Sequence, residues 1–142
     1  MSVDQEIPEF GTSNYDLYIN DVDHLKLSML ISKYIDCLSI EQCPYTCNMV
    51  LRTVAFVAQK HFAEEEMVMR NYNYGHYLAH KESHTWLLAH INGLVETLDH
   101  ARSIEEIDAP SVIQFLIKWF SDHSFHEDCI LHDYLTIVRS PH

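Results

Sequence analysis

The chain has 142 residues, and its 9 Lys and Arg against 21 Asp and Glu give a formal net charge of -12. That length fits one domain with a substantial core, and the negative charge would repel a nucleic acid. No segment approaches the roughly 20 consecutive apolar residues of a membrane helix, and the polar first residues lack a signal-peptide pattern. We therefore expect a single soluble, cytoplasmic domain over residues 1–142, with neither nucleic acid nor membrane as a partner.

Turn-forming residues are scarce, with only three glycines and four prolines. A β protein needs many turns, so this composition favours an all-α fold. Residues 1–20 are expected to form an N-terminal arm. A first helix is predicted over about 21–40, because its apolar residues recur at three- and four-residue spacing and form one stripe: Leu25, Leu27, Leu30, Ile31, Tyr34, Ile35 and Leu38.

Three further helices follow in the same way. Pro44 opens the second, over about 44–72, and Gly75 is available for the left-handed residue that ends it. The third covers about 76–101. The fourth covers about 109–138, with Asp108 as its cap, Pro110 in its first turn, and apolar contacts from Val112, Phe115, Leu116, Trp119 and Ile130. Four amphipathic helices with short connections pack most economically as an up-down-up-down four-helix bundle.

The four cysteines are too few and too irregularly spaced for a disulfide framework in a chain of this size. We expect Cys37, Cys43, Cys47 and Cys129 to be reduced thiols. The C-x-x-x-C spacing of Cys43 and Cys47 matches neither a thioredoxin-like motif nor a common zinc motif. A structural role is favoured, and a redox pair across one helical turn is the alternative.

Histidine lies on the predicted inward stripes of three helices, and a further one precedes the stripe of the first. His61 with Glu65, and His80 with His84, have the four-residue spacing that puts side chains on one helix face. One buried histidine is more often a hydrogen-bonded core residue than a metal ligand. Five neutral imidazoles in an apolar core would each need a donor and an acceptor, whereas metal ions would satisfy them together.

The ligand types indicate which metal to expect. Imidazole and carboxylate without thiolate suit a first-row ion, and iron is the natural candidate in a bundle core. A zinc-protease motif is excluded, because H-E-x-x-H needs glutamate after its first histidine and Lys81 follows His80. The sequence therefore predicts an iron site in the core.

The chain resembles the hemerythrins, specifically the bacterial hemerythrin-like domains, over about residues 10–136. The matching motifs are I-x-D-x-x-H ending at His24, H-F-x-x-E-E from His61, H-x-x-x-H from His80, and W-x-x-x-H-x-x-x-x-D from Trp119. The resemblance implies two iron ions, bridged by oxide or hydroxide and by carboxylates. One iron would be bound by His80, His84 and His123 and the other by His24 and His61, with Glu65 and Asp128 as bridges.

These ligands leave room for O2. Two six-coordinate irons offer about twelve positions, of which five imidazoles, two bridging carboxylates and a bridging oxide fill about eleven. In the family the open position lies on the iron with two histidines, where O2 binds. His123 and Asp128 are five residues apart, about 140° around an ideal helix, so we predict a local widening or distortion of the fourth helix between them.

The resemblance also places Leu27, Phe62, Trp119, Phe120 and Ser124 around the O2 pocket. The family pattern has leucine and isoleucine where this chain has Phe120 and Ser124. A bulkier wall and a hydroxyl near the open position would admit water or supply a proton and so shorten the lifetime of the O2-bound state. This favours a sensor over a carrier, and replacing Ser124 with isoleucine should lengthen that lifetime.

Several polar residues remain outside the ligand set. Asp21 and Asp23 are candidates to cap the first helix, and Asp21 is also a candidate to orient His24. Glu66, His126 and Glu127 are candidates for contact with ligands, while a solvated face is the simplest interpretation of the acidic residues Glu64, Glu66, Glu82 and Asp133. No ligand role is expected for the remaining histidines, which are His76, His90, His100, His126, His132 and His142.

The leading interpretation is a non-haem di-iron domain that binds O2 without turning it over. Sensing of O2 or redox state, with this domain as the N-terminal sensor of a signalling protein such as a diguanylate cyclase, is favoured over O2 storage or delivery. The alternative from another class is a di-iron oxidase, peroxidase or nitric-oxide-handling enzyme on the same ligands. A structural bundle that binds adventitious metal is a third interpretation.

Overall fold

The structure is a computed structural model that describes residues 13–40, 43–102, 106–123 and 127–138. These residues form five helices and no strand, which confirms the all-α prediction. The helices are α1 (Ser13–Ser39), α2 (Pro44–Asn71), α3 (Tyr77–Asp99), α4 (Ala109–Asp122) and α5 (Asp128–Val138). Helix α1 begins within the segment predicted to be an N-terminal arm, of which residues 1–12 lie outside the described residues.

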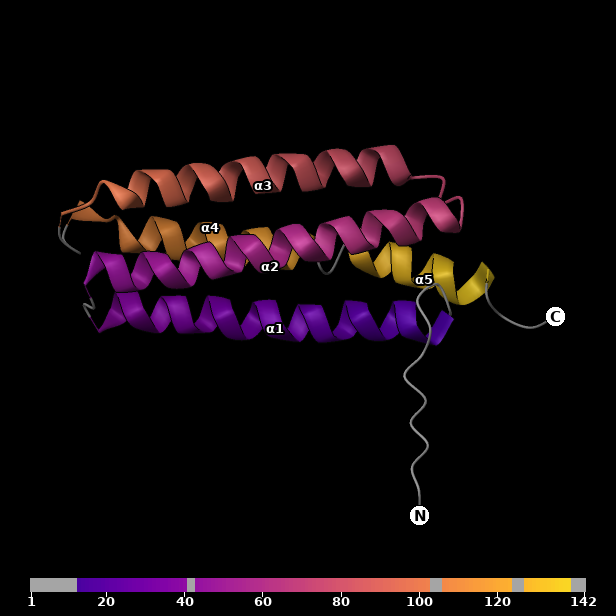
Figure 1. The fold of residues 1–142 in the computed structure, drawn as a ribbon, viewed down its shortest axis with the longest axis horizontal. Coiled ribbons are helices and arrows are strands. Elements are labelled where there is room, and N and C mark those ends of the chain that lie inside the picture. Colours follow the sequence, from indigo (N-terminus) through magenta and orange to yellow (C-terminus); the bar gives the residue numbers. More distant parts are fainter. Residues whose placement is uncertain (1–12, 41–42, 103–105, 124–126, 139–142) are drawn as a thin grey trace, which may run out of the picture.

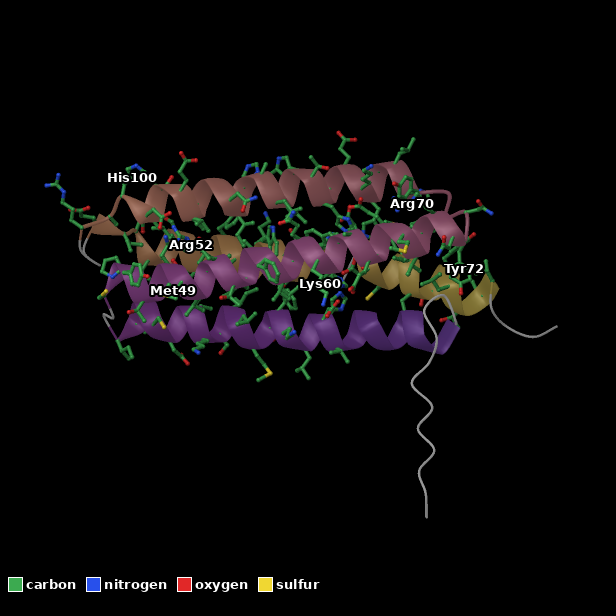
Figure 2. The ribbon with its side chains drawn as sticks, viewed as in Figure 1. Met49, Arg52, Lys60, Arg70, Tyr72 and His100 are labelled. Atoms are coloured by element: carbon green, nitrogen blue, oxygen red, sulfur yellow. The ribbon has the colours of Figure 1, made fainter. Side chains whose placement is uncertain are left out.

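The long helices form a bundle. Figure 1 shows α1, α2, α3 and α4 side by side along the longest axis of the molecule, with α5 beyond the end of α4. Helix α2 packs against both α1 and α3, and α1 also contacts α4. Side chains from these helices fill the space between the ribbons (Figure 2). None of the described helices is long and apolar enough to cross a membrane.

Local sequence explains most helix boundaries. Pro44 lies in the first turn of α2, and the Asp108 carboxylate accepts a hydrogen bond from the backbone N–H of Ser111 at the start of α4. The expected left-handed residue after α2 is Asn73, with φ 53°, and not Gly75. Asparagine tolerates this conformation better than most residues do, so it ends the helix as glycine would.

Two clusters of buried apolar side chains occupy the interior. The larger apolar cluster extends from Leu27 to Trp119 and includes Tyr34, Leu51, Ile91 and Leu116. The smaller apolar cluster lies toward α5 and consists of Val68, Met69, Tyr74, Leu131 and Leu135. The inward positions predicted for Leu25 and Ile130 are wrong, since these side chains are 63% and 54% exposed.

Candidate metal centre

Seven polar side chains meet inside the bundle, and we call them the polar cluster. The polar cluster lies between the two apolar clusters. Along α2, Glu65 of the polar cluster stands between Phe62 of the larger apolar cluster and Val68 of the smaller one. The members from α2 and α3 are pairs at four-residue spacing, so each pair lies on one helix face. The cluster consists of His24 from α1, His61 and Glu65 from α2, His80 and His84 from α3, His123 at the end of α4, and Asp128 at the start of α5.

The side chains of the polar cluster are buried although they are polar or charged. Six of the seven are buried, and the imidazole of His24 is 23% exposed. Charged and polar groups are rarely placed in a core unless they are paired or coordinate a metal. Their burial therefore requires a partner for each nitrogen and oxygen.

The polar cluster divides into two overlapping groups of potential ligands. One group combines Glu65 and Asp128 with three histidines, and the other combines the same two carboxylates with two histidines. Within each group, one ligand atom from every residue lies within 4.8 Å of the others. The three-histidine group contains His80, His84 and His123, and the two-histidine group contains His24 and His61.

Each carboxylate divides its two oxygens between the groups. Asp128 directs Oδ1 toward Nε2 of His80 and His123, at 3.1 and 3.0 Å, and Oδ2 toward Nε2 of His24, at 2.6 Å. Glu65 directs Oε1 toward Nε2 of His80 and His84, at 2.8 and 3.0 Å, and Oε2 toward Nε2 of His61, at 3.3 Å. This is the arrangement that two carboxylates need to bridge two cations.

Some contacts within the polar cluster are poor as hydrogen bonds. His61 Nε2 and Glu65 Oε2 face each other, yet among the described residues neither atom makes a hydrogen bond. The Nε2 atoms of His84 and His123 lie only 3.1 Å apart, so at least one of them must carry a proton in the absence of a cation. A metal ion in each group would satisfy these atoms, and the nitrogen and oxygen donors fit such an ion.

The comparisons with known proteins agree with this geometry. The family model of the hemerythrin HHE cation binding domain matches residues 18–135. The chain belongs to this family. Comparison with curated proteins and with solved structures finds no significant match. The polar cluster is thus the candidate cation site of a hemerythrin-like domain.

The fourth predicted helix of this hemerythrin-like domain is interrupted where the prediction places a distortion. It ends at Asp122 and resumes at Asp128 as α5. His123 and Glu127, on either side of the segment 124–126 that lies outside the described residues, have π-helical conformation. A π-helical turn has i→i+5 hydrogen bonds and is wider than an α-helical turn. The distortion is confirmed, and it lets His123 and Asp128 reach the same site although they are five residues apart.

Three further carboxylates hold the outer nitrogens of the histidines. His61 Nδ1 lies 3.0 Å from Asp23, His84 Nδ1 lies 2.8 Å from Glu66, and His123 Nδ1 lies 2.6 Å from Glu127. Ser83 Oγ donates a further hydrogen bond to Glu127, at 2.6 Å. Carboxylates in this position keep the proton on Nδ1 and leave the Nε2 lone pair directed at the metal site.

Sequence reasoning found only part of this outer set. Glu66 and Glu127 were identified as candidates, and both contact a ligand. Asp23 and Ser83 were not assigned such contacts, because these depend on how helices pack and not on spacing within one helix. The side chain of Asp21, the predicted partner of His24, lies outside the described residues. His76, His90 and His100 are exposed and His132 is half-buried, while His126 and His142 lie outside the described residues.

The carboxylates control how the histidines hold protons. Burial lowers the pKa of His61, but its hydrogen bond to Asp23 and its contact with the negative charge of Glu65 raise it to about 10. In the same way, burial opposes protonation of His123 and His80, and hydrogen bonds to Asp128 and other carboxylates raise their pKa values to about 11 and about 9. Without metal, protons therefore neutralise the carboxylates, and a bound cation must displace them.

The pKa values of the two carboxylates in the polar cluster, Asp128 and Glu65, are lowered where those of the histidines are raised. Burial raises the pKa of Asp128, and so does the charge of Glu65, but hydrogen bonds from His123, His24 and His80 lower it to about 2. Burial likewise opposes ionisation of Glu65, and the four histidines that face its carboxylate hold its pKa well below the usual value. Both side chains are therefore ionised at neutral pH and ready to bind a cation.

A small cavity of about 10 Å³ adjoins the two-histidine group. That volume is at the lower limit of the room needed for one water molecule. Four residues predicted around the O2 pocket, Leu27, Phe62, Trp119 and Phe120, line it together with His24, His61, His123 and Asp128. The fifth, Ser124, lies outside the described residues.

Proposed function

We propose that this hemerythrin-like domain holds two iron ions and binds O2 reversibly in the small cavity beside His24 and His61. The observation that carries the proposal is the division of Glu65 and Asp128 oxygens between a three-histidine and a two-histidine group. A reduced pair of irons, when bound, would supply the two electrons that reversible O2 binding needs. In this proposal the fold is an up-down-up-down four-helix bundle with the di-iron site in its core.

The unequal groups support a single binding position for O2. His80, His84 and His123 would fill more of the coordination sphere of one iron than His24 and His61 fill of the other. The cavity adjoins the two-histidine side and is walled mainly by the apolar side chains of Leu27, Phe62, Trp119 and Phe120. These walls restrict the entry of water and of proton donors, which would otherwise promote irreversible oxidation.

We further propose that O2 or redox sensing, in a cytoplasmic protein with a signalling output domain, is the biological role. Phe120 in the cavity wall supports sensing over storage, because it departs from the leucine of the family pattern and a bulkier wall would shorten the lifetime of the O2-bound state. The signal would arise from a change in the ligand set, which reaches all four long helices through His24, His61, His84 and His123.

Metal analysis with optical spectra tests the central proposal. Protein from iron-supplemented cells should contain about two irons per chain, be colourless when reduced without oxygen, and develop a visible absorption band on exposure to O2 that disappears when O2 is removed. Substoichiometric iron that a chelator removes easily would contradict the proposal. Sustained consumption of O2 or peroxide with a reductant present would instead support the oxidase or peroxidase alternative.

A further inference from the structure

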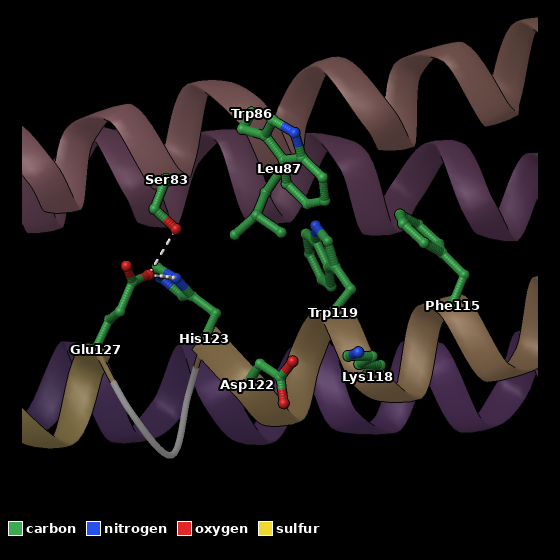
Figure 3. A pocket seen from close by; sticks show the side chains of 9 residues that line it. All are labelled: Ser83, Trp86, Leu87, Phe115, Lys118, Trp119, Asp122, His123 and Glu127. Atoms are coloured by element: carbon green, nitrogen blue, oxygen red, sulfur yellow. Dashed lines mark hydrogen bonds and ion pairs between the residues drawn. The ribbon is translucent and has the colours of Figure 1, made fainter.

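A second and much larger cavity, of about 440 Å³, lies between α3 and α4 (Figure 3). Its volume is within the range of small-molecule binding sites, whereas the cavity beside His24 is at the lower limit of the room needed for one water molecule. His123 and Glu127 form part of its wall, so the cavity reaches the outer side of the metal centre. Reversible O2 binding has no use for a space of this size.

Aromatic rings make up much of the cavity wall. Trp86, Phe115, Trp119 and His123 all line it. The chain has only two tryptophans, and both are in this wall. Aromatic side chains favour stacked or edge-to-face contact with other rings, so this wall favours a flat aromatic ligand.

Trp119 contributes an unused hydrogen-bond donor. Its side chain is buried, with 5% exposure, and its Nε1 makes no hydrogen bond to any described residue. Figure 3 shows this nitrogen turned toward Leu87 and Trp86 across the cavity. A buried N–H without an acceptor is costly, and a ligand oxygen would remove that cost. Trp86 is 55% exposed and its ring packs against that of His90, with centroids 3.8 Å apart, so it forms a solvent-facing part of the cavity wall.

The charges on the wall decide against a strongly charged ligand. Lys118 favours a partly negative atom nearby, and within the described residues it forms no ion pair. The carboxylates of Asp122 and Glu127 line the same cavity and would repel a full negative charge. A neutral carbonyl oxygen can accept from the Trp119 N–H without that repulsion.

We propose that this cavity binds an uncharged, flat aromatic molecule with ring carbonyl oxygens, the chemistry that quinones share with the isoalloxazine ring of flavins. The rings of Trp86 and Phe115 contact its faces or edges, and the Trp119 indole donates to a carbonyl oxygen. The ligand lies beside His123, next to the proposed metal centre. Binding requires no metal, so this inference stands apart from the proposed function.

Fluorescence titration and calorimetry test the inference on air-exposed protein from iron-supplemented cells. The probes are lumiflavin and tetramethyl-1,4-benzoquinone, whose fully substituted ring resists addition of the exposed thiols of Cys43 and Cys129. Because both tryptophans line the cavity, either probe should quench protein fluorescence saturably with one molecule bound per chain. Binding of only one probe supports the inference and identifies the ring type, and saturable binding of neither overturns it.

Variants locate the bound probe. Trp119→Phe keeps a ring but removes the N–H, and should weaken binding about tenfold, the effect of losing one hydrogen bond. Trp86→Ala, which removes a largely exposed ring, should weaken it by a similar factor and tests the site even if Trp119→Phe fails to fold. The control Phe56→Ala removes a ring that is 69% exposed on α2, and should leave affinity unchanged. Unchanged affinity in both tryptophan variants would overturn the inference.

Discussion

The larger apolar cluster around Leu51 and Leu116 and the polar cluster beside it are buried to a similar degree. Burial favours the first, since each apolar side chain gains free energy when it leaves water. It disfavours the second, since imidazoles and carboxylates lose their hydration and must be compensated by protons or cations. The same bundle thus contains a part that is stabilised by burial alone and a part whose burial must be compensated by protons or a bound cation.

Removing a carboxylate that belongs to both groups of potential ligands should abolish metal binding by the polar cluster. Asp128→Ala deprives both groups of a ligand, so purified protein should lose most of its bound metal, as measured by elemental analysis after gel filtration. Asp133→Ala is the matched control, because Asp133 is exposed on the same helix. Metal content equal to that of the wild type in Asp128→Ala would contradict the assignment.

Truncating a residue of the larger apolar cluster should lower stability without lowering metal content. Leu116→Ala, at a fully buried position, should lower the free energy of unfolding by about 2–5 kcal/mol while metal content stays unchanged. Urea denaturation measures the first quantity and elemental analysis the second. Ile117→Ala, at a neighbouring half-exposed position, should change stability by no more than about 0.5 kcal/mol.

The outer carboxylates should have an intermediate effect on the polar cluster. Glu127→Ala removes the acceptor of His123 Nδ1 and of Ser83, so metal affinity should fall about 10- to 100-fold in a competition titration with a chelator. Glu82→Ala, at an exposed position on α3, should leave affinity unchanged. An unaltered affinity in Glu127→Ala would mean that His123 is oriented without this contact.

The polar cluster should make stability depend on pH, whereas the aliphatic side chains of the larger apolar cluster carry no titratable group. In metal-free protein His61, His80 and His123 keep a proton up to pH of about 9 to 11, while in the unfolded chain they lose it near 6.5. The folded form therefore binds more protons in this interval, and its stability should decline as pH rises from about 6.5. The urea midpoint should be lower at pH of about 9 than at about 6.

Acid should destabilise the metal-free protein for the opposite reason. Asp128 has a pKa of about 2 in the folded protein and 3.8 ordinarily, so its contribution to stability is present above pH 3.8 and is lost as pH falls through about 2.

Metal should change the alkaline behaviour. In metal-loaded protein the cation replaces the histidine protons, so the decline in stability at alkaline pH should become smaller. An identical alkaline decline with and without metal would contradict the role assigned to these histidines.

The smallest change is expected at the start of α4, where no member of the polar cluster lies. Asp108→Ala removes the carboxylate that accepts from Ser111 at the start of α4, and should cost about 1 kcal/mol in urea denaturation. Metal content should stay as in the wild type. A loss of metal would show that the start of α4 is coupled to the polar cluster.

Much of the fold follows from local sequence. The scarcity of glycine and proline, the apolar stripes, Pro44 and Asp108 were sufficient to predict an all-α chain and the starts of α2 and α4. The left-handed residue was assigned to Gly75 in error, because asparagine at position 73 can adopt the same conformation. Leu25 and Ile130 were placed inward because hydrophobicity alone does not decide which face of a helix meets a neighbour.

The sequence by itself indicated that five histidines and Glu65 lie at helical spacing on or beside the inward apolar stripes, and its resemblance to the hemerythrins added Asp128 and the division of these ligands into two groups. Only the tertiary structure decided how Glu65 and Asp128 divide their oxygens, that Asp23 and Ser83 contact the site, and that two tryptophans line a second cavity. Spacing along a helix specifies a face. Distances between atoms on different helices depend on how those helices pack, and no pattern in one chain segment contains that information.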